Sequence, residues 1–352
     1  MNKLSALRKQ FGEYNIDGLL VTDSYNRRYI TEFTGTTGLA IISFKDAKFI
    51  TDFRYMEQAS DQVKGYEIIE NRAMFQEAAK QAEDMGITRL GIEQENLNLK
   101  QYNELIGLLK IECVPVSGVI ENLREIKSKD EIEKIKTAAS ISDKAFKHIL
   151  DFIRPGVTEM EINHELEYQV RKNGATASSF DLIIASGYRS ALPHGVASNK
   201  KVEKGDMLTL DFGALYEGYC SDMTRTIAVG EPKPELKEIY TIVLDALHLG
   251  ISEIKSGQSC KVVDDKVRAF ITDKGYGDEF GHGTGHSFGL EIHENPYFSS
   301  KSTDVLKTNM VMTVEPGIYL PGIGGVRIED DVLVTDDGYE VLTNAPKELI
   351  IL

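Results

Sequence analysis

A helix-pair pattern occurs twice in the second half of this 352-residue chain, with an offset of 101 residues between the copies. Residues 153–158 correspond to residues 254–259, and a glycine follows each segment at the same offset. In each copy we expect one helix to end before the segment's own glycine. The hydroxyl of Thr158 or Ser259 is expected to cap the next helix, which the following glycine ends. The pattern predicts an internal repeat of paired helices, and each pair leads into a β-hairpin.

The first hairpin, residues 207–227, carries Asp211 and Asp222. If it turns near Tyr216 and Glu217, the two aspartates fall opposite each other on neighbouring strands, with Cβ atoms roughly 5 Å apart. Like charges directly opposed on a sheet are unfavourable unless a cation lies between them. This hairpin therefore predicts a cation site.

The second hairpin, residues 310–329, repeats this arrangement later in the chain. A turn at Gly322 puts Glu315 opposite Glu329 on the returning strand. Asp330 and Asp331 compete with Glu329 as ligands, and the hairpin register favours Glu329 unless a bulge changes it. Two hairpins thus each predict a pair of opposed carboxylates.

Carboxylates joined by an imidazole suit Mn²⁺, Co²⁺, Fe²⁺ or Zn²⁺, whereas thiolate-rich sites favour zinc or iron–sulfur clusters. We expect His286 to supply the imidazole. Its neighbours Gly281, Gly283 and Gly285 disfavour a helix and indicate a loop or strand that a substrate can approach closely. Two divalent ions would balance four carboxylates and activate a shared water for hydrolysis of an amide or phosphate. The predicted metal ligands are Asp211, Asp222, His286, Glu315 and Glu329.

Three further histidines, His194, His282 and His293, are expected around the metals, where they would bind substrate or stabilise a tetrahedral intermediate. Each of them, taken alone, could equally be a hydrogen-bonded structural histidine. Arg327 lies two positions before Glu329, so both side chains share a face on a regular strand. Its guanidinium could hold a ligand carboxylate or bind a substrate carboxylate bidentately.

The composition limits the partners of the chain. A net charge of −15 argues against nucleic acid as the main partner, because phosphate binding needs a basic face. Three widely spaced cysteines give neither a disulfide pattern nor a CxxC zinc site, which fits a reducing compartment. No apolar run approaches the ~20 residues of a membrane span and the first residues are not a signal peptide, so we expect a cytoplasmic location.

The length allows two domains, and the fold class expected for the chain is α/β, or α+β. Residues 1–125 form a mixed α/β unit in this interpretation, with strands predicted at apolar runs such as 39–42 and 90–92. Nothing in that unit has catalytic spacing. Ser128 is expected to cap the first helix of the second domain, residues 126–352.

The motifs around the predicted ligands resemble the pita-bread metallopeptidase family, which contains methionine aminopeptidases, aminopeptidase P and Xaa-Pro dipeptidase (prolidase). The family's ligand order of two Asp, one His and two Glu is matched in full. The resemblance covers roughly residues 126–352 and implies a pita-bread catalytic domain with pseudo-twofold symmetry. It is carried by Pro193-His194-Gly195, Gly281-His282-Gly283-Thr284-Gly285-His286, Val314-Glu315-Pro316-Gly317 and Val326-Arg327-Ile328-Glu329-Asp330.

Residues 1–125 resemble the N-terminal domain of the prolidase and aminopeptidase P branch, which creatinase shares, in segments 26–30, 34–35 and 51–55. Methionine aminopeptidases generally lack this domain, and creatinase lacks the metal ligands. The resemblance implies a homodimeric peptidase that uses two divalent ions to cleave the bond between an N-terminal residue and proline. Short Xaa-Pro peptides are the expected substrates, and Mn²⁺ is the expected metal, with Co²⁺ and Zn²⁺ as alternatives.

The resemblance also implies roles for the side chains. Glu315 would hold a metal and pass a proton to the leaving proline nitrogen, while His194 and His293 would position the peptide and steady the oxyanion. His282 would support the solvent on the metals. Arg327 is a candidate for binding the free carboxylate of a dipeptide.

The length and the short N-terminal domain resemble those of compact prokaryotic prolidases, and this resemblance favours Xaa-Pro dipeptidase over aminopeptidase P acting on longer peptides. A noncatalytic binding protein of the same fold is a further alternative, which the intact ligands disfavour. A two-metal phosphatase is another, and it should show more cationic residues around the site.

Overall fold

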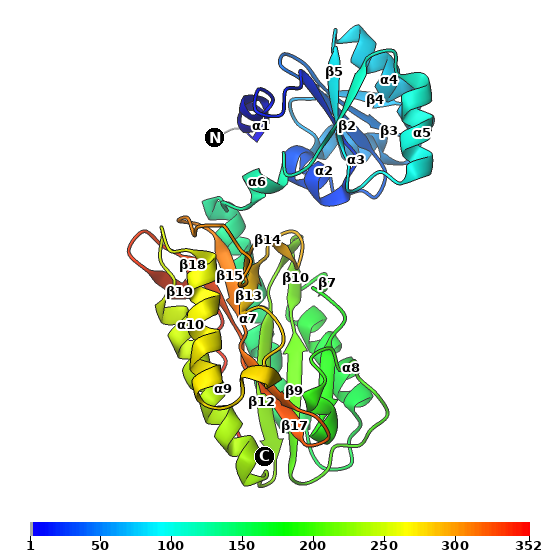
Figure 1. The fold of residues 1–352 in the computed structure, drawn as a ribbon. Coiled ribbons are helices and arrows are strands. Elements are labelled where there is room, and N and C mark those ends of the chain that lie inside the picture. The colour runs from blue at the N-terminus through cyan, green and yellow to red at the C-terminus, as the bar shows by residue number, and fades with distance from the viewer. Residues whose placement is uncertain (1–2) are drawn as a thin grey trace. The chain divides into compact units, whose positions relative to one another are not determined.

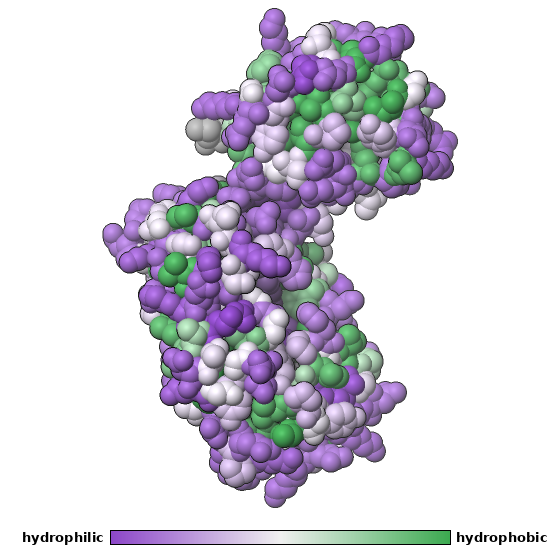
Figure 2. All heavy atoms as spheres, in the orientation of Figure 1, coloured by the Kyte–Doolittle hydropathy of each residue, from purple (hydrophilic) through white to green (hydrophobic). Residues whose placement is uncertain are grey.

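The computed structural model describes residues 3–352, and the chain divides into two compact units, Met1–Arg124 and Glu125–Leu352. The division falls one residue before the boundary expected from the sequence. Both units combine helices with strands (Figure 1), which confirms the mixed fold class. Hydrophilic side chains cover much of the visible face of each unit, interrupted by apolar groups (Figure 2).

The first unit is built on a six-stranded mixed sheet. Its strands are β1 (Gly18–Val21), β2 (Leu39–Ser43), β3 (Ala47–Thr51), β4 (Glu67–Glu70), β5 (Arg89–Glu93) and β6 (Glu112–Val116), in the spatial order β4-β3-β2-β1-β5-β6. Its helices are α1 (Lys3–Gln10), α2 (Ser24–Thr31), η1 (Phe53–Tyr55), α3 (Met56–Gln62), α4 (Met74–Asp84), α5 (Leu99–Leu108) and α6 (Glu121–Arg124). Apolar side chains of α4 and α5 share one core with the central strands, and β2 and β5 confirm the two predicted runs.

Two helix pairs frame the second unit. They are α7 (Lys129–Phe152) with α8 (Glu159–Lys172), and α9 (Pro234–Ser252) with α10 (Cys260–Asp273). α8 and α10 have the same length of 14 residues and start 101 residues apart, which confirms the repeat. Thr158 caps α8 and Ser128 caps α7, each in a capping box with a glutamate. The expected cap at Ser259 is wrong, because its side chain makes no capping hydrogen bond.

Strands lie between the two helix pairs, with α9 and α10 on one side and α8 on the other (Figure 1). One core joins α7 and α8 to the earlier strands, and another joins α9 and α10 to the later ones. The earlier strands and turns are β7 (Ala177–Ser178), β8 (Ile183–Ser186), η2 (Gly187–Ala191), β9 (Asp206–Phe212), β10 (Ala214–Tyr216), β11 (Tyr219–Cys220) and β12 (Met223–Val229). The later ones are η3 (Gly277–Glu279), β13 (Gly285–Ser287), β14 (Glu294–Phe298), β15 (Val311–Val314), β16 (Gly317–Leu320), β17 (Gly324–Arg327), β18 (Asp330–Val334) and β19 (Tyr339–Val341).

The register of the first hairpin differs from the prediction by two residues. Asp211 on β9 pairs with Thr224 on β12, so Asp222 does not lie directly opposite Asp211. The chain turns at Glu217 and Gly218, which both have positive φ (47° and 86°), one residue later than assumed. A two-residue turn with both φ values positive is the geometry that fits the strand twist. Because Asp222 is two residues from Thr224, it still shares a face with Asp211 as a diagonal neighbour.

The second hairpin has the predicted register. Val314, just before Glu315, pairs with Asp330, and Gly317, two residues after Glu315, pairs with Arg327. Both pairs belong to one continuous register, which places Glu315 opposite Glu329. The turn beyond β16 passes through Gly322, whose positive φ of 77° favours glycine.

Candidate active site

A cavity of about 580 Å³ lies in the second unit, among the strands that carry the predicted ligands. Its apolar wall includes Phe180, Ile183 and Ile292. The five predicted metal ligands, the three accessory histidines and Arg327 all line this one cavity, although they come from segments far apart in the chain. They are His194, Asp211, Asp222, His282, His286, His293, Glu315, Arg327 and Glu329.

Three of these side chains form a compact cluster of potential metal ligands. One ligand atom each from Asp222, His286 and Glu329 lies within 4.8 Å of the other two, and all three residues are buried. The His286 Nε2 atom is 3.6 Å from Asp222 Oδ2 and 3.5 Å from Glu315 Oε1. Two carboxylates and an imidazole converging in this way are a donor set that divalent transition metals accept.

Asp211 borders the same cavity with one oxygen bonded and the other free. Its Oδ2 accepts a hydrogen bond from Arg327 Nη2 at 2.5 Å. Its Oδ1 is buried and has no hydrogen-bond partner among the described residues. A buried carboxylate oxygen without a partner is costly unless a cation meets it, so Asp211 fits a metal ligand.

The electrostatics of the cluster favour cations. Burial, followed by the charge of neighbouring carboxylates, raises the pKa of Asp222 and of Glu329 well above their ordinary values. Burial also raises the pKa of Glu315 to about 7. Four carboxyl groups around one cavity destabilise one another's charged forms. Divalent ions would remove this penalty, and the residues present therefore fit a metal centre.

His286 is arranged as a neutral ligand. Burial, with a smaller contribution from His293, lowers its pKa to about 4. Its Nδ1 lies 3.0 Å from the backbone oxygen of Ser287, and Nδ1–H can donate to that carbonyl. This leaves the Nε2 lone pair facing the carboxylates, which is the tautomer that a metal requires.

Arg327 does not contact Glu329, the carboxylate beside which the sequence placed it. Its three nitrogens donate instead to Asp211, Tyr319, the Pro193 carbonyl and the Thr224 hydroxyl. Four of its five N–H groups therefore donate hydrogen bonds, and one of these bonds orients Asp211.

Tyr319 is a site residue that the sequence reasoning missed. Its hydroxyl lies 2.9 Å from His282 Nε2 and accepts from Arg327 Nη1 at 2.8 Å. Since Arg327 can only donate, the phenol donates to His282, whose Nδ1–H then donates to the Gly283 carbonyl. The hairpin register could have found Tyr319, because it shares a strand face with Glu315 four residues earlier.

The two remaining histidines are both exposed. The imidazole of His293 packs edge-on against that of His286, with ring centroids 4.5 Å apart. His194 is exposed and follows Pro193, whose carbonyl is bonded to Arg327. Both side chains can therefore reach a molecule bound in the cavity.

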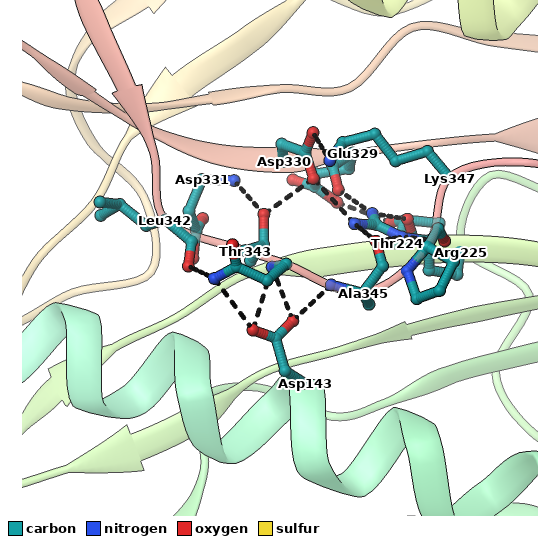
Figure 3. A network of polar contacts seen from close by, with 12 residues as sticks. Asp143, Thr224, Arg225, Glu329, Asp330, Asp331, Leu342, Thr343, Ala345 and Lys347 are labelled. Carbon is teal, nitrogen blue, oxygen red and sulfur yellow. Dashed lines mark hydrogen bonds and ion pairs between the residues drawn. The ribbon is translucent and has the colours of Figure 1, made fainter.

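Asp330 and Asp331, the alternative ligands, do not line the cavity. They lie in a buried polar network behind it (Figure 3). Asp330 binds Arg225 Nη2 at 2.8 Å, and Asp331 Oδ2 accepts the backbone N–H of Asp222 at 3.0 Å. The hydroxyl of Thr224 donates to Glu329 Oε2 at 2.6 Å. The network thus holds the ligand strands from behind, as supporting groups do in metal sites.

Both units match known families. Residues 133–336 match the model of metallopeptidase family M24, and residues 3–126 match the Creatinase/Prolidase N-terminal domain. The first match covers more than half of the chain. The protein belongs to metallopeptidase family M24. The resemblance inferred from the sequence motifs is thereby confirmed.

Relatives of this M24 peptidase match it over nearly the whole chain. It is 57% identical to a solved Xaa-Pro dipeptidase from Bacillus anthracis, over 99% of each chain with a TM-score of 0.98. It is 41% identical to Xaa-Pro dipeptidase from Pyrococcus furiosus, over 99% of each chain. An X-Pro aminopeptidase from Thermotoga maritima is 39% identical over 98% of this chain and 100% of that one, with a TM-score of 0.90. Within residues 3–352 of the M24 peptidase, no helix is long and apolar enough to cross a membrane.

Proposed function

We propose that this protein hydrolyses the peptide bond between an N-terminal residue and proline, with Xaa-Pro dipeptides as its preferred substrates. The observation that carries the proposal is the convergence of four carboxylates and three accessory histidines on His286 in one cavity. The relatives named Xaa-Pro dipeptidase support the choice of substrate. A noncatalytic binding protein would need neither this donor set nor the accessory histidines.

The residues that would hold two divalent ions are Asp211, Asp222, His286, Glu315 and Glu329. We propose Mn²⁺ as the metal, because hard carboxylate oxygens predominate and thiolates are absent from the cavity lining. When bound, the ions supply a water activated for attack on a carbonyl and neutralise the carboxylates.

The chain's own groups would do the rest. Glu315 would hold a metal and pass a proton toward the leaving proline nitrogen, as the family resemblance implies. His293 and His194 would hydrogen-bond the peptide and stabilise negative charge on its carbonyl oxygen. His282 acts differently from the sequence expectation in this proposal, because both of its ring nitrogens are engaged; it would hold Tyr319, and through it Arg327.

Aminopeptidase P activity on longer peptides is the second candidate, and one feature of the cavity favours it. Arg327 is the only lysine or arginine among the described residues that line the cavity, and its nitrogens are all engaged. A dipeptide's free carboxylate therefore cannot bind two Arg327 nitrogens at once without displacing a hydrogen bond that Arg327 already makes. The likeness to the Thermotoga maritima aminopeptidase points the same way.

Hydrolysis of Ala-Pro beside Ala-Pro-Ala tests both candidates, using protein stripped of metal and resupplied with Mn²⁺. Metal-dependent cleavage of Ala-Pro with little cleavage of the tripeptide supports the dipeptidase. Preferred cleavage of Ala-Pro-Ala would replace it with aminopeptidase P. Cleavage of neither peptide by protein with bound Mn²⁺ would reject proline specificity.

We also propose that the protein acts as a homodimer, as the family resemblance implies, and that it is located in the cytoplasm, as its widely spaced cysteines suggest. Light scattering coupled to size exclusion distinguishes a dimer from the 39.2 kDa monomer. The net charge of −15 supports the absence of a nucleic-acid partner.

A further inference from the structure

Lys127 is buried at the start of the second unit, with 2% of its surface exposed. Its ammonium group donates to Ser287 Oγ at 3.2 Å and to Glu294 Oε2 at 3.1 Å. Its backbone N–H donates to the Asn309 carbonyl, directly before β15. Lysine is almost never buried this fully unless its charge is paired. The ion pair with Glu294 is therefore what allows Lys127 to be buried.

The two partners of Lys127 close the base of one loop. Ser287 on β13 and Glu294 on β14 are cross-strand partners, and residues 288–293 connect them. Gly289 within the loop packs so tightly that an added Cβ would lie 3.0 Å from the Glu294 carboxylate and 3.1 Å from Lys127 Cε. The ammonium group therefore fixes the two ends of the loop together.

Each partner adjoins an imidazole of the active site. Ser287 follows His286, and its backbone oxygen is the acceptor that sets the orientation of the His286 ring. Glu294 follows His293, the last residue of the loop. The His286 and His293 rings pack edge-on at 4.5 Å. Lys127 thus bonds the residue that follows each of these two imidazoles.

We propose that Lys127 is a positioning residue of the active site, which acts through Ser287 and Glu294 on His286 and His293. A buried ion pair is weak evidence for a role in stability alone, because an apolar pair of similar shape often stabilises as well or better. What an apolar pair cannot do is fix the Ser287 hydroxyl and the Glu294 carboxylate at one point. Supporting groups of this kind change metal affinity or activity by about 10- to 100-fold.

The test compares Lys127→Met with Lys200→Met in the full-length protein. Lys200 is a matched control, because its ammonium also contacts one serine hydroxyl, Ser186 Oγ at 3.0 Å, and one carboxylate, Asp206 Oδ2 at 2.7 Å. Three quantities are measured for each variant: the melting temperature without metal, the Mn²⁺ affinity by calorimetry, and kcat and KM for Ala-Pro. The Mn²⁺ affinity rests on the proposed metal, and only kcat and KM rest on the proposed substrate.

Lys127→Met is expected to weaken Mn²⁺ binding about 10-fold or more and to lower kcat/KM by a similar factor. Lys200→Met should change the melting temperature without changing either of these quantities. Equal Mn²⁺ affinity and kcat/KM in both variants and the wild type would overturn the proposal. If Lys127→Met loses Mn²⁺ affinity while the wild type itself does not cleave Ala-Pro, the positioning role is retained and the proposed dipeptidase activity is rejected.

Glu294→Gln keeps the proposal falsifiable if Lys127→Met does not fold. It preserves the shape of the side chain and removes the charge that holds the ammonium group. The same loss of Mn²⁺ affinity is expected, and wild-type affinity in folded Glu294→Gln would overturn the proposal.

Discussion

The hydroxyl of Tyr319 lies 2.9 Å from Nε2 of His282, a residue that lines the cavity. The same hydroxyl accepts from Arg327, whose other terminal nitrogen binds Asp211. Burial raises the pKa of the phenol, so it stays protonated and can keep donating. An unbroken chain of hydrogen bonds therefore runs from His282 to a proposed metal ligand.

Tyr319→Phe is expected to lower kcat/KM for Ala-Pro by about 10- to 100-fold. The change removes a hydrogen bond to a charged guanidinium, worth about 1.5–3 kcal/mol, and lets Arg327 and Asp211 shift. Tyr240→Phe is the control, since that phenol donates to the Lys347 carbonyl and does not line the cavity. Steady-state kinetics of the two variants give the comparison, and equal activities would exclude a role for the Tyr319 hydroxyl.

Asp222→Asn is expected to abolish the rise in melting temperature that Mn²⁺ gives the wild type, since ligand binding stabilises the folded state. Without metal, the same variant should melt at or above the wild-type temperature at pH 8. The buried Asp222 carboxylate is destabilised by burial and by Glu329 and Asp211, and an amide removes that repulsion.

Thermal melts with and without Mn²⁺ measure both effects. Asp265→Asn is the control, because Asp265 is exposed and pairs with Lys261 on the surface of α10. A full Mn²⁺-induced shift in the Asp222 variant would remove Asp222 from the proposed ligand set.

The second hairpin could be predicted from the sequence because a single turn position, Gly322, determines its register. The register of the first hairpin could not, because the predicted turn near Tyr216 and Glu217 is one residue earlier than the turn that the positive φ values of Glu217 and Gly218 mark. The error moved the partner of Asp211 by two residues. It left the face unchanged, so the predicted ligands still reached the cavity.

Contacts between distant segments were beyond the sequence patterns. Lys127 bonds to residues 160 and 167 positions away, and Arg225 to carbonyls 120 positions away. Periodicity and turn signals describe neighbours along one element, so they carry no information about such pairs. The resemblance to a family supplied the ligand order, but the supporting network appears only in the folded chain.

Mn²⁺ affinity is expected to rise with pH between about 6 and 8, by up to ~10-fold per pH unit for each proton displaced. Glu315, whose pKa is raised to about 7, must lose its proton to bind a metal. Calorimetry in two buffers of different ionisation enthalpy counts the protons released. An affinity independent of pH, with no proton release, would contradict this expectation.

The stability of the metal-free protein should fall over the same range. The pKa of Glu315 in the folded chain is raised above its ordinary value of 4.5. Its contribution to stability is therefore fully present below pH 4.5 and is lost as the pH rises through about 7. Urea unfolding with and without Mn²⁺ should show a stability difference that widens as pH rises. A stability difference that does not change with pH would mean that Glu315 has the same pKa in the Mn²⁺-bound and the metal-free protein.

Arg225→Met is expected to destabilise the metal-free protein by about 3–5 kcal/mol, because it leaves Asp330 buried without its closest cation. The guanidinium of Arg225 is fully buried and also donates to the carbonyls of Glu329 and Ala345 (Figure 3). Lys347→Met is the matched variant, since Lys347 contacts the same Asp330 carboxylate at 3.1 Å but is partly exposed.

The Lys347 variant should lose only about 1 kcal/mol, because Lys347 is partly exposed and Arg225 still pairs with Asp330 in that variant. Urea unfolding measures both variants against the wild type. Both substitutions remove one cation from the same carboxylate. The difference between their losses in the free energy of unfolding therefore measures what the other hydrogen bonds of Arg225 contribute. Equal losses of stability in the two variants would show that Arg225 stabilises the protein through the charge of Asp330. Its hydrogen bonds to the Glu329 and Ala345 carbonyls would then contribute little.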